Sequence, residues 1–219
     1  MKLKMAVYTK INQKEINIIN KNFNIDKIIS FKGIKQGIEN TNYLLKSKKK
    51  KYILTIFEKR VLQKEIPFFM KLMDNLNSSE INCPKPIKTK NNKYLIKLKN
   101  KNASIVSFLK GKDKKILKIN DCYAIGKAIA RMHIITKKMK IKRKNSMGIR
   151  NLKSLLESIK FKSKKFSNLK IFLKNNLKDI NKNWPKQLPK GIIHGDLFID
   201  NIFFKNKKLS GIIDFYFAA

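Results

Sequence analysis

The stretch Gly191-Ile-Ile-His-Gly-Asp-Leu-Phe-Ile-Asp-Asn201 leads from a short apolar run into a segment of polar side chains. A few residues later, Leu209-Ser-Gly-Ile-Ile-Asp-Phe215 repeats the pattern of an apolar run followed by an aspartate. We expect both apolar runs, 191–194 and 209–215, to form buried strands. The first would end at His194, with Asp196 in the turn beyond it, and the second would deliver Asp214. If the two strands are adjacent, the two carboxylates lie close together.

These two aspartates and Asn201 are the parts that phosphoryl transfer needs. A carboxylate orients the attacking hydroxyl and accepts its proton, and hard oxygen ligands hold Mg²⁺ against the phosphates of a nucleotide. We assign Asp196 as the base and Asn201 and Asp214 as the metal ligands, and we expect His194 to brace the turn through hydrogen bonds. The plainer alternative is a pair of turn-capping aspartates and a hairpin asparagine, which is common chemistry in loops.

The first half of the chain predicts a small antiparallel sheet accompanied by two helices. Asn12 followed by Glu15 is a capping-box signal at the start of a helical apolar stripe, and Pro67 is suited to the first turn of the second helix. Apolar runs bounded by turn residues predict strands at 28–31, 42–45, 52–57, 94–96 and 103–109. Gly33 and Gly37 would lie in the loop between the first two strands.

The second half shows mostly helical periodicity. We expect helices at 120–136, 151–160 and 166–182, and a further short strand at 202–204. His133, on the first of these helices, is expected to be a buried, hydrogen-bonded histidine. The whole predicts an α+β fold of two lobes, a small sheet lobe over about 5–108 and a mostly helical lobe over about 109–219. Ligands commonly bind in the cleft at such a boundary.

The strong positive charge does not by itself indicate a nucleic-acid partner. The 219 residues include 52 Lys+Arg and 14 Asp+Glu, for a net charge of +38, yet only four of the basic residues are arginine. Lysine occurs throughout the chain together with isoleucine and asparagine, which indicates a coding bias, whereas nucleic-acid recognition favours arginine and interleaved aromatic residues. We therefore expect no nucleic-acid partner, with a basic nucleic-acid-binding module as the alternative from another class.

Targeting and redox signals are weak. No apolar run at the start is long enough for a signal peptide, and no stretch approaches the ~18 apolar residues of a membrane helix. Cys83 and Cys122 belong to no CxxC motif or Cys/His cluster, so neither a disulfide framework nor a zinc site is expected. These observations predict a cytoplasmic protein with no membrane partner.

The motif His194-Gly-Asp-x4-Asn201, together with Ile213-Asp-Phe215, resembles the catalytic and metal motifs of the aminoglycoside-phosphotransferase-like kinases. More narrowly, the chain resembles the bacterial homoserine kinases of that superfamily, from about residue 5 to the last residue. Two strings narrow the resemblance in this way, Glu39-Asn-Thr-Asn-Tyr43 and Asp214-Phe-Tyr-Phe-Ala218. Other matching strings are Phe31-Lys-Gly-Ile34, Tyr52-Ile-Leu-Thr55, Glu58-Lys-Arg60, Pro67-Phe-Phe69 and Cys83-Pro84.

The resemblance implies a two-lobed, protein-kinase-like phosphotransferase domain over residues 5–219. It implies transfer of the γ-phosphate of ATP to the side-chain hydroxyl of L-homoserine, giving O-phospho-L-homoserine for threonine biosynthesis, with Asp196 catalytic and Mg²⁺ on Asn201 and Asp214. ATP would contact the first inter-strand loop and the connector between the lobes, at Gly33, Gly37, Asn40, Thr41, Asn42, Phe108 and Leu109. Another small-molecule kinase of this fold, acting on choline, a sugar or an aminoglycoside, is the alternative within the enzyme class.

Two features depart from the superfamily pattern. Thr55 stands where a strand lysine or arginine usually reaches the nucleotide phosphates, and an apolar residue near Phe69 stands where its glutamate partner is usual. Lys59 and Arg60 are the candidates to replace that basic residue. The chain also ends five residues after Asp214, where the family continues into further helices. We therefore expect a C-terminally truncated domain that lacks part of the substrate pocket.

Overall fold

The computed structural model describes residues 7–37, 39–79, 81–159, 166–185 and 187–219. The first element is helix α1 (Gln13–Asn22), which begins as the sequence predicts. The side chain of Asn12 accepts a hydrogen bond from the Lys14 N–H, and the Glu15 carboxylate accepts the Asn12 N–H at 2.8 Å. This reciprocal capping box satisfies backbone donors that a helix start leaves unpaired.

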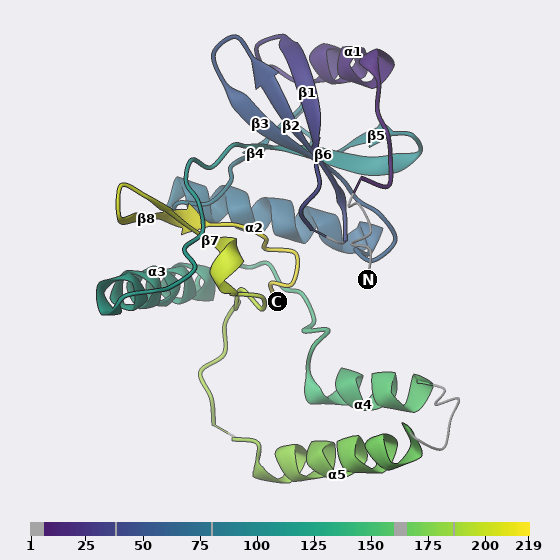
Figure 1. The fold of residues 1–219 in the computed structure, drawn as a ribbon, viewed down its shortest axis with the longest axis vertical. Coiled ribbons are helices and arrows are strands. Elements are labelled where there is room, and N and C mark those ends of the chain that lie inside the picture. Colours follow the sequence, from purple (N-terminus) through teal and green to yellow (C-terminus); the bar gives the residue numbers. More distant parts are fainter. Residues whose placement is uncertain (1–6, 38, 80, 160–165, 186) are drawn as a thin grey trace.

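A six-stranded sheet forms the upper part of the molecule (Figure 1). Its order is β1-β2-β3-β6-β4, with β5 also paired to β6, and every pairing is antiparallel, as predicted for the sheet. The short strand β4 was not predicted. The strands are β1 (Ile28–Ile34), β2 (Thr41–Ser47), β3 (Lys51–Ile56), β4 (Pro86–Ile87), β5 (Ile96–Leu98) and β6 (Lys101–Ser107). Buried residues of α1 and of the sheet form one hydrophobic cluster, so α1 covers the sheet on one side.

Several strand boundaries differ from the predictions. Gly33 lies within β1, paired with Tyr43, so the connection to β2 is shorter than expected. The strand expected at 94–96 begins only at Ile96, and it turns into β6 through Lys99 and Asn100, both with positive φ. That backbone conformation makes a two-residue hairpin, which apolar patterning alone does not place. β6 ends at Ser107, and Phe108 and Leu109 therefore belong to the connector.

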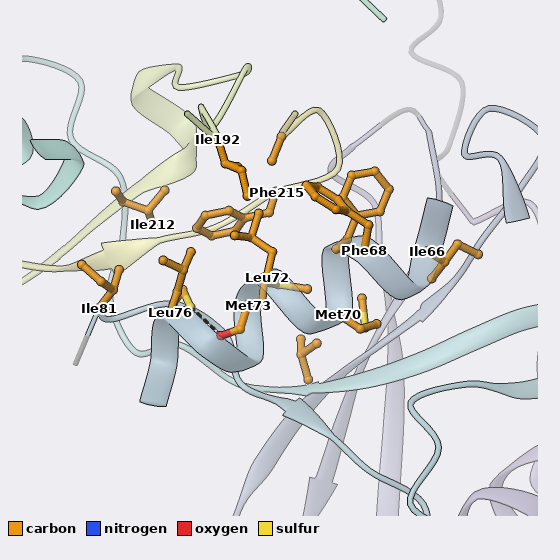
Figure 2. Close-up of a cluster of buried hydrophobic side chains, with 14 of the residues drawn as sticks. Ile66, Phe68, Met70, Leu72, Met73, Leu76, Ile81, Ile192, Ile212 and Phe215 are labelled. Carbon is orange, nitrogen blue, oxygen red and sulfur yellow. Dashed lines mark hydrogen bonds between the residues drawn. The ribbon is translucent and has the colours of Figure 1, made fainter. Parts of the chain in front are cut away.

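Helix α2 (Ile66–Ser78) lies between the sheet and the C-terminal segments and supplies seven buried residues to the larger core (Figure 2). Pro67 occupies its first turn, and the predicted stripe of Phe68, Phe69, Leu72, Met73 and Leu76 is buried together with Ile66 and Met70. Figure 2 shows Ile192, Ile212 and Phe215 packed against this helix from the other lobe. Burying such side chains contributes about 1.5–3 kcal/mol each, which holds the two lobes together.

The second lobe contains α3 (Ile119–Lys137), α4 (Ile149–Ser158), α5 (Ser167–Asn183) and a hairpin of β7 (Ile202–Lys205) and β8 (Lys208–Ile212). The described residues also include the short 3₁₀ helices η1 (Gln63–Glu65), before α2, and η3 (Ile199–Asn201), before β7. In Figure 1, α4 and α5 lie side by side, set apart from the sheet. None of the described helices is both long and apolar enough to span a bilayer.

The C-terminal strands are shorter than predicted. Residues 191–194 form no strand, because only Ile193 is paired, through two backbone hydrogen bonds with Ala219. β8 ends at Ile212, so Asp214 follows the strand by two residues and does not end it. His133 is exposed on α3, which contradicts the expected buried histidine. The predicted helix end at 160 and the start of the basic turn after it lie outside the described residues.

Candidate active site

A cleft of about 500 Å³ opens between the β1–β2 connection and the loops that follow Ile192 and Ile212. It brings together side chains that are far apart in the sequence and come from both lobes. Its lining consists of Gly37, Glu39, Asn40, Asn42, Arg60, Met147, Gly195, Asp196, Phe198, Asp214, Tyr216 and Phe217. Asp196 and Asp214, which the sequence predicts to converge, thus share one cavity.

Asp196 is held by the residues just before it. The buried imidazole of His194 accepts the Asp196 N–H through Nδ1 at 3.3 Å, and its Nε2 lies 2.9 Å from the Ile213 carbonyl oxygen. Burial lowers the pKa of His194, so the ring is neutral near pH 7. Gly195 has φ +79°, and a Cβ at this position would lie 2.6 Å from the Phe217 carbonyl oxygen. Only glycine fits this turn without strain.

Asn201 completes the same turn from η3. Its Nδ2 donates to the Asp196 carbonyl oxygen at 2.8 Å and to Asp196 Oδ2 at 3.3 Å. Its own carbonyl oxygen accepts the Ile213 N–H at 2.9 Å. Asn201 therefore touches both the Asp196 turn and the backbone just before Asp214, although it does not line the cleft itself.

Asp214 faces the cleft from a strained backbone position with φ +64°. Its side chain is open to the cleft, but the surrounding protein desolvates the carboxyl, and the charges of Asp196 and Glu39 add repulsion. These effects raise the pKa of Asp214 to about 6. A carboxylate disfavoured in this way gains most from a cation bound beside it.

The oxygen atoms of Asp196, Asn201 and Asp214 are of the type that a hard divalent cation prefers. Among the residues that the structure describes, no three His, Cys, Asp or Glu side chains are placed to hold a metal by themselves. That sparse set fits Mg²⁺, which is usually held by one or two carboxylates together with substrate phosphates and water. The residues present therefore fit a metal that arrives with a nucleotide.

The sheet-side wall of the cleft is built from amide side chains with fixed partners. Asn40 is buried, and its Oδ1 accepts the Glu58 N–H at 3.2 Å. Asn42 Oδ1 accepts the Thr55 hydroxyl at 2.8 Å. Gly37 has φ +93°, and a Cβ added there would meet no atom within 4 Å, so the connection makes an open turn at this residue. This wall is polar and neutral apart from Glu39 and Arg60.

Four predicted nucleotide-binding residues do not line the cleft. Gly33 is part of β1, and Thr41 is fully buried with its hydroxyl bonded to Glu58 Oε1 and to the backbone N–H of Thr9. Phe108 and Leu109 lie in the connector, and the Phe108 N–H already donates to the Lys51 carbonyl oxygen at 3.3 Å. Thr41 therefore acts in packing the sheet lobe, for which the linear sequence carried no signal.

Several cleft residues were not predicted. Glu39 lies inside one of the strings that carry the family resemblance, but no role was expected of its side chain. Met147, Phe198, Tyr216 and Phe217 also line the cleft. Phe198 follows Asp196 by two residues, and Tyr216 and Phe217 follow Asp214 directly, so their positions follow from the motifs themselves. Met147 comes from a separate loop, and no local sequence pattern relates it to Asp196.

Residues 30–219 match the family model described as the phosphotransferase enzyme family. Curated proteins named homoserine kinase are similar over nearly the whole chain. The one from Methylocella silvestris is 37% identical over 216 residues, and the one from Paramagnetospirillum magneticum is 39% identical over 222 residues. The alignments cover 98% of this chain and 67% and 68% of those relatives. The chain thus spans about two thirds of their length.

Solved structures with the same fold have low sequence identity to the chain. A spectinomycin phosphotransferase in complex with ADP and spectinomycin gives a TM-score of 0.65 at 18% identity, over 96% of this chain and 70% of that one. An amicoumacin kinase in complex with AMP-PNP and Ca²⁺ gives 0.73 at 17% identity, over 96% and 65%. These likenesses confirm the predicted two-lobed, kinase-like α+β fold.

Proposed function

The chain belongs to the phosphotransferase enzyme family and, within it, to the homoserine kinases, and from this premise we propose its reaction and the residues that perform it. The γ-phosphate of ATP passes to the side-chain hydroxyl of L-homoserine, which gives ADP and O-phospho-L-homoserine. This step belongs to threonine biosynthesis, and we place it in the cytoplasm, where the free thiols of Cys83 and Cys122 stay reduced.

The observation that carries this proposal is the shared cleft of Asp196 and Asp214, with Asn201 bonded to the Asp196 turn. In this assignment Asp196 Oδ1 or Oδ2 receives the proton of the homoserine hydroxyl as that oxygen attacks phosphorus. Asn201 keeps the carboxylate of Asp196 oriented by donating to Oδ2. Proton acceptance by a held carboxylate is the contribution that kinases of this type require from the protein.

Asn201 and Asp214 are the residues that would hold Mg²⁺. When bound with ATP, the cation offsets the charge that develops on the transferred phosphoryl group. The chain's own part is to present oxygen ligands on a backbone fixed by His194 and by the Asn201–Ile213 hydrogen bond. The raised pKa of Asp214 indicates a position where negative charge is poorly compensated without a cation.

The nucleotide would lie along the sheet-side wall. Gly37, Asn40 and Asn42 line the cleft and are assigned to the phosphates, while the connector at Phe108 and Leu109 is assigned to the adenine. Because the Phe108 N–H is already bonded, the adenine contact would fall to the Phe108 carbonyl and to the Leu109 backbone. Gly33 and Thr41 support this wall from within the sheet.

The proposal is tested by coupled ADP release from the purified chain with ATP, Mg²⁺ and one acceptor at a time. We expect turnover with L-homoserine and background rates with choline, a sugar and an aminoglycoside. Asp196→Asn should bind Mg-nucleotide as the wild type does but lose turnover. A folded wild-type chain without turnover on any acceptor refutes the kinase assignment, and full turnover by Asp196→Asn refutes the assigned base.

A further inference from the structure

Arg60 is the only cationic side chain that lines the cleft among the residues that the structure describes. It follows β3 and reaches the cavity beside Glu39, with which its guanidinium forms an ion pair. The guanidinium carbon also lies 5.1 Å from the centre of the Phe217 ring. Both neighbours line the same cavity, so the charge of Arg60 is directed to the cleft and not to bulk solvent alone.

Of the described residues, the charged ones that line the cleft are three carboxylates and one guanidinium. Glu39, Asp196 and Asp214 all line it, and a nucleotide would add several further negative charges. Thr55 of β3 is buried and donates its hydroxyl to the cleft residue Asn42, so this contact of β3 with the wall carries no charge.

We propose that, when ATP binds, the Arg60 guanidinium leaves Glu39 and binds the phosphate groups of the nucleotide instead. This proposal rests on the proposed kinase function and extends it. The guanidinium matches phosphate oxygens through two parallel hydrogen bonds, as it matches a carboxylate. The exchange is easy because the Arg60 side chain is 57% exposed, and ion pairs with an exposed partner contribute little to stability. Glu39 thus keeps the Arg60 guanidinium at the cavity until the phosphate groups of a nucleotide replace the Glu39 carboxylate.

Other basic residues near the cleft do not meet these conditions. Lys59 is exposed and does not line the cavity. Arg143 is committed elsewhere, with its guanidinium bonded to Glu65 and to the Ala218 carbonyl oxygen. The structure therefore separates the two candidates that the sequence offers, and it selects Arg60.

The test is calorimetric binding of Mg-ADP and of adenosine to the 219-residue chain, which needs no turnover. We expect Arg60→Ala to weaken Mg-ADP binding by roughly ten-fold or more, because a charge-assisted double hydrogen bond is lost, and to leave adenosine binding unchanged. Arg60→Lys, which keeps the charge but not the two parallel donors, should weaken Mg-ADP binding by an intermediate factor. Lys59→Ala is the matched control and should bind Mg-ADP as the wild type does.

Glu39→Gln tests the exchange itself. Removing the competing carboxylate should tighten Mg-ADP binding, and unchanged or weaker binding overturns the exchange. Equal Mg-ADP affinity in Arg60→Ala and wild type overturns the assignment. If Arg60→Ala instead raises only the KM for homoserine, the guanidinium binds the carboxylate of the acceptor, and the assignment is overturned as well. A wild-type chain that binds neither ADP nor ATP refutes the proposed function instead, so the two failures are distinguishable.

Discussion

His194 Nε2 lies 2.9 Å from the carbonyl oxygen of Ile213, the residue that immediately precedes Asp214. The other ring nitrogen, Nδ1, accepts the N–H of Asp196 at 3.3 Å. Because Nδ1 accepts, the proton of the neutral ring is on Nε2 and is donated to Ile213. A single imidazole thus fixes the distance between the two loops that carry the carboxylates, and its edge-on contact with Phe215 anchors it to the core.

Replacing this ring should separate stability from positioning. His194→Phe keeps an aromatic ring in contact with Phe215 but leaves the Asp196 N–H and the Ile213 carbonyl without partners. We expect a loss of about 2–4 kcal/mol in the free energy of unfolding, measured by urea denaturation. We also expect kcat to fall by roughly ten-fold or more, since small displacements of reacting groups are costly.

Two further variants make this prediction specific. His194→Gln retains an amide that can donate to Ile213 and should recover part of both losses. His133→Phe, at the exposed histidine of α3, is the matched control and should change neither quantity. Wild-type kcat in His194→Phe would show that the ring does not position the catalytic loop.

The raised pKa of Asp214 predicts a pH dependence of opposite sign for stability and for metal binding. The pKa is about 6 in the folded protein, above the ordinary 3.8. The folded state therefore binds this proton more tightly than the unfolded state does. The resulting stability is fully present below pH 3.8 and is lost as the pH rises through 6. Metal-nucleotide binding, which needs the carboxylate, should instead weaken as the pH falls through 6.

The fall in Mg-ADP affinity toward low pH is checked by measuring that affinity between about pH 5 and 8. In Asp196→Asn, where one repelling charge is gone, the midpoint should move to lower pH. At the alkaline end of this range and without metal, Asp214→Asn should be more stable than the wild type, because it carries no poorly compensated charge. The Mg-ADP affinity of Asp214→Asn should be strongly reduced. If the Mg-ADP affinity of Asp196→Asn falls with the same pH midpoint as that of the wild type, the two carboxylates are not coupled.

Local patterns predicted much of the fold because local physics determines it. The capping box at Asn12, the proline in the first turn of α2 and its apolar stripe each depend on residues within one or two turns of helix. The antiparallel pairing of β1, β2 and β3 follows from short polar connections between apolar runs. Asp196 and Asp214 were expected together because 191–194 and 209–215 were predicted to be adjacent strands; the two aspartates do share the cleft, although 191–194 form no strand.

Features that depend on contacts between distant segments were not predictable in the same way. Residues 191–194 have the composition of a strand, but they pair only through Ile193 with Ala219, and a single bridge makes no strand. Thr41 looks like a loop residue until Glu58 and the Thr9 backbone are placed beside it. The pairing of Arg60 with Glu39 likewise joins two loops of the folded sheet lobe.

Arg143 stabilises the junction between α2 and the C-terminal loop. Its guanidinium bonds Glu65 at 2.8 and 3.0 Å and the Ala218 carbonyl oxygen at 3.2 Å, and its side chain is only 8% exposed. We expect Arg143→Ala to lower the free energy of unfolding by about 2–3 kcal/mol, because the carboxylate and carbonyl lose a charged donor. Arg150→Ala, at an exposed arginine of α4, should change it by less than about 0.5 kcal/mol. Equal losses in the two variants would contradict the role of Arg143.

Gly195 links the stability of the catalytic turn to its chemistry. Its φ of +79° is unfavourable for other residues, and an added Cβ would meet the Phe217 carbonyl oxygen, a backbone atom that cannot move aside cheaply. We expect Gly195→Ala to lower the free energy of unfolding by about 2 kcal/mol or more and to abolish turnover by displacing Asp196.

The matched control for Gly195 is Gly126→Ala in α3, where a Cβ would meet no atom within 4 Å. Helical alanine is favoured over glycine, so this variant should gain roughly 0.5–1 kcal/mol and keep full turnover. Thermal and urea denaturation of both variants, alongside the ADP-release assay, measure the contrast. If Gly195→Ala were as stable and active as Gly126→Ala, the turn would tolerate a side chain. The position of the Asp196 carboxylate would then not depend on the close packing of the His194–Asp196 turn against Phe217.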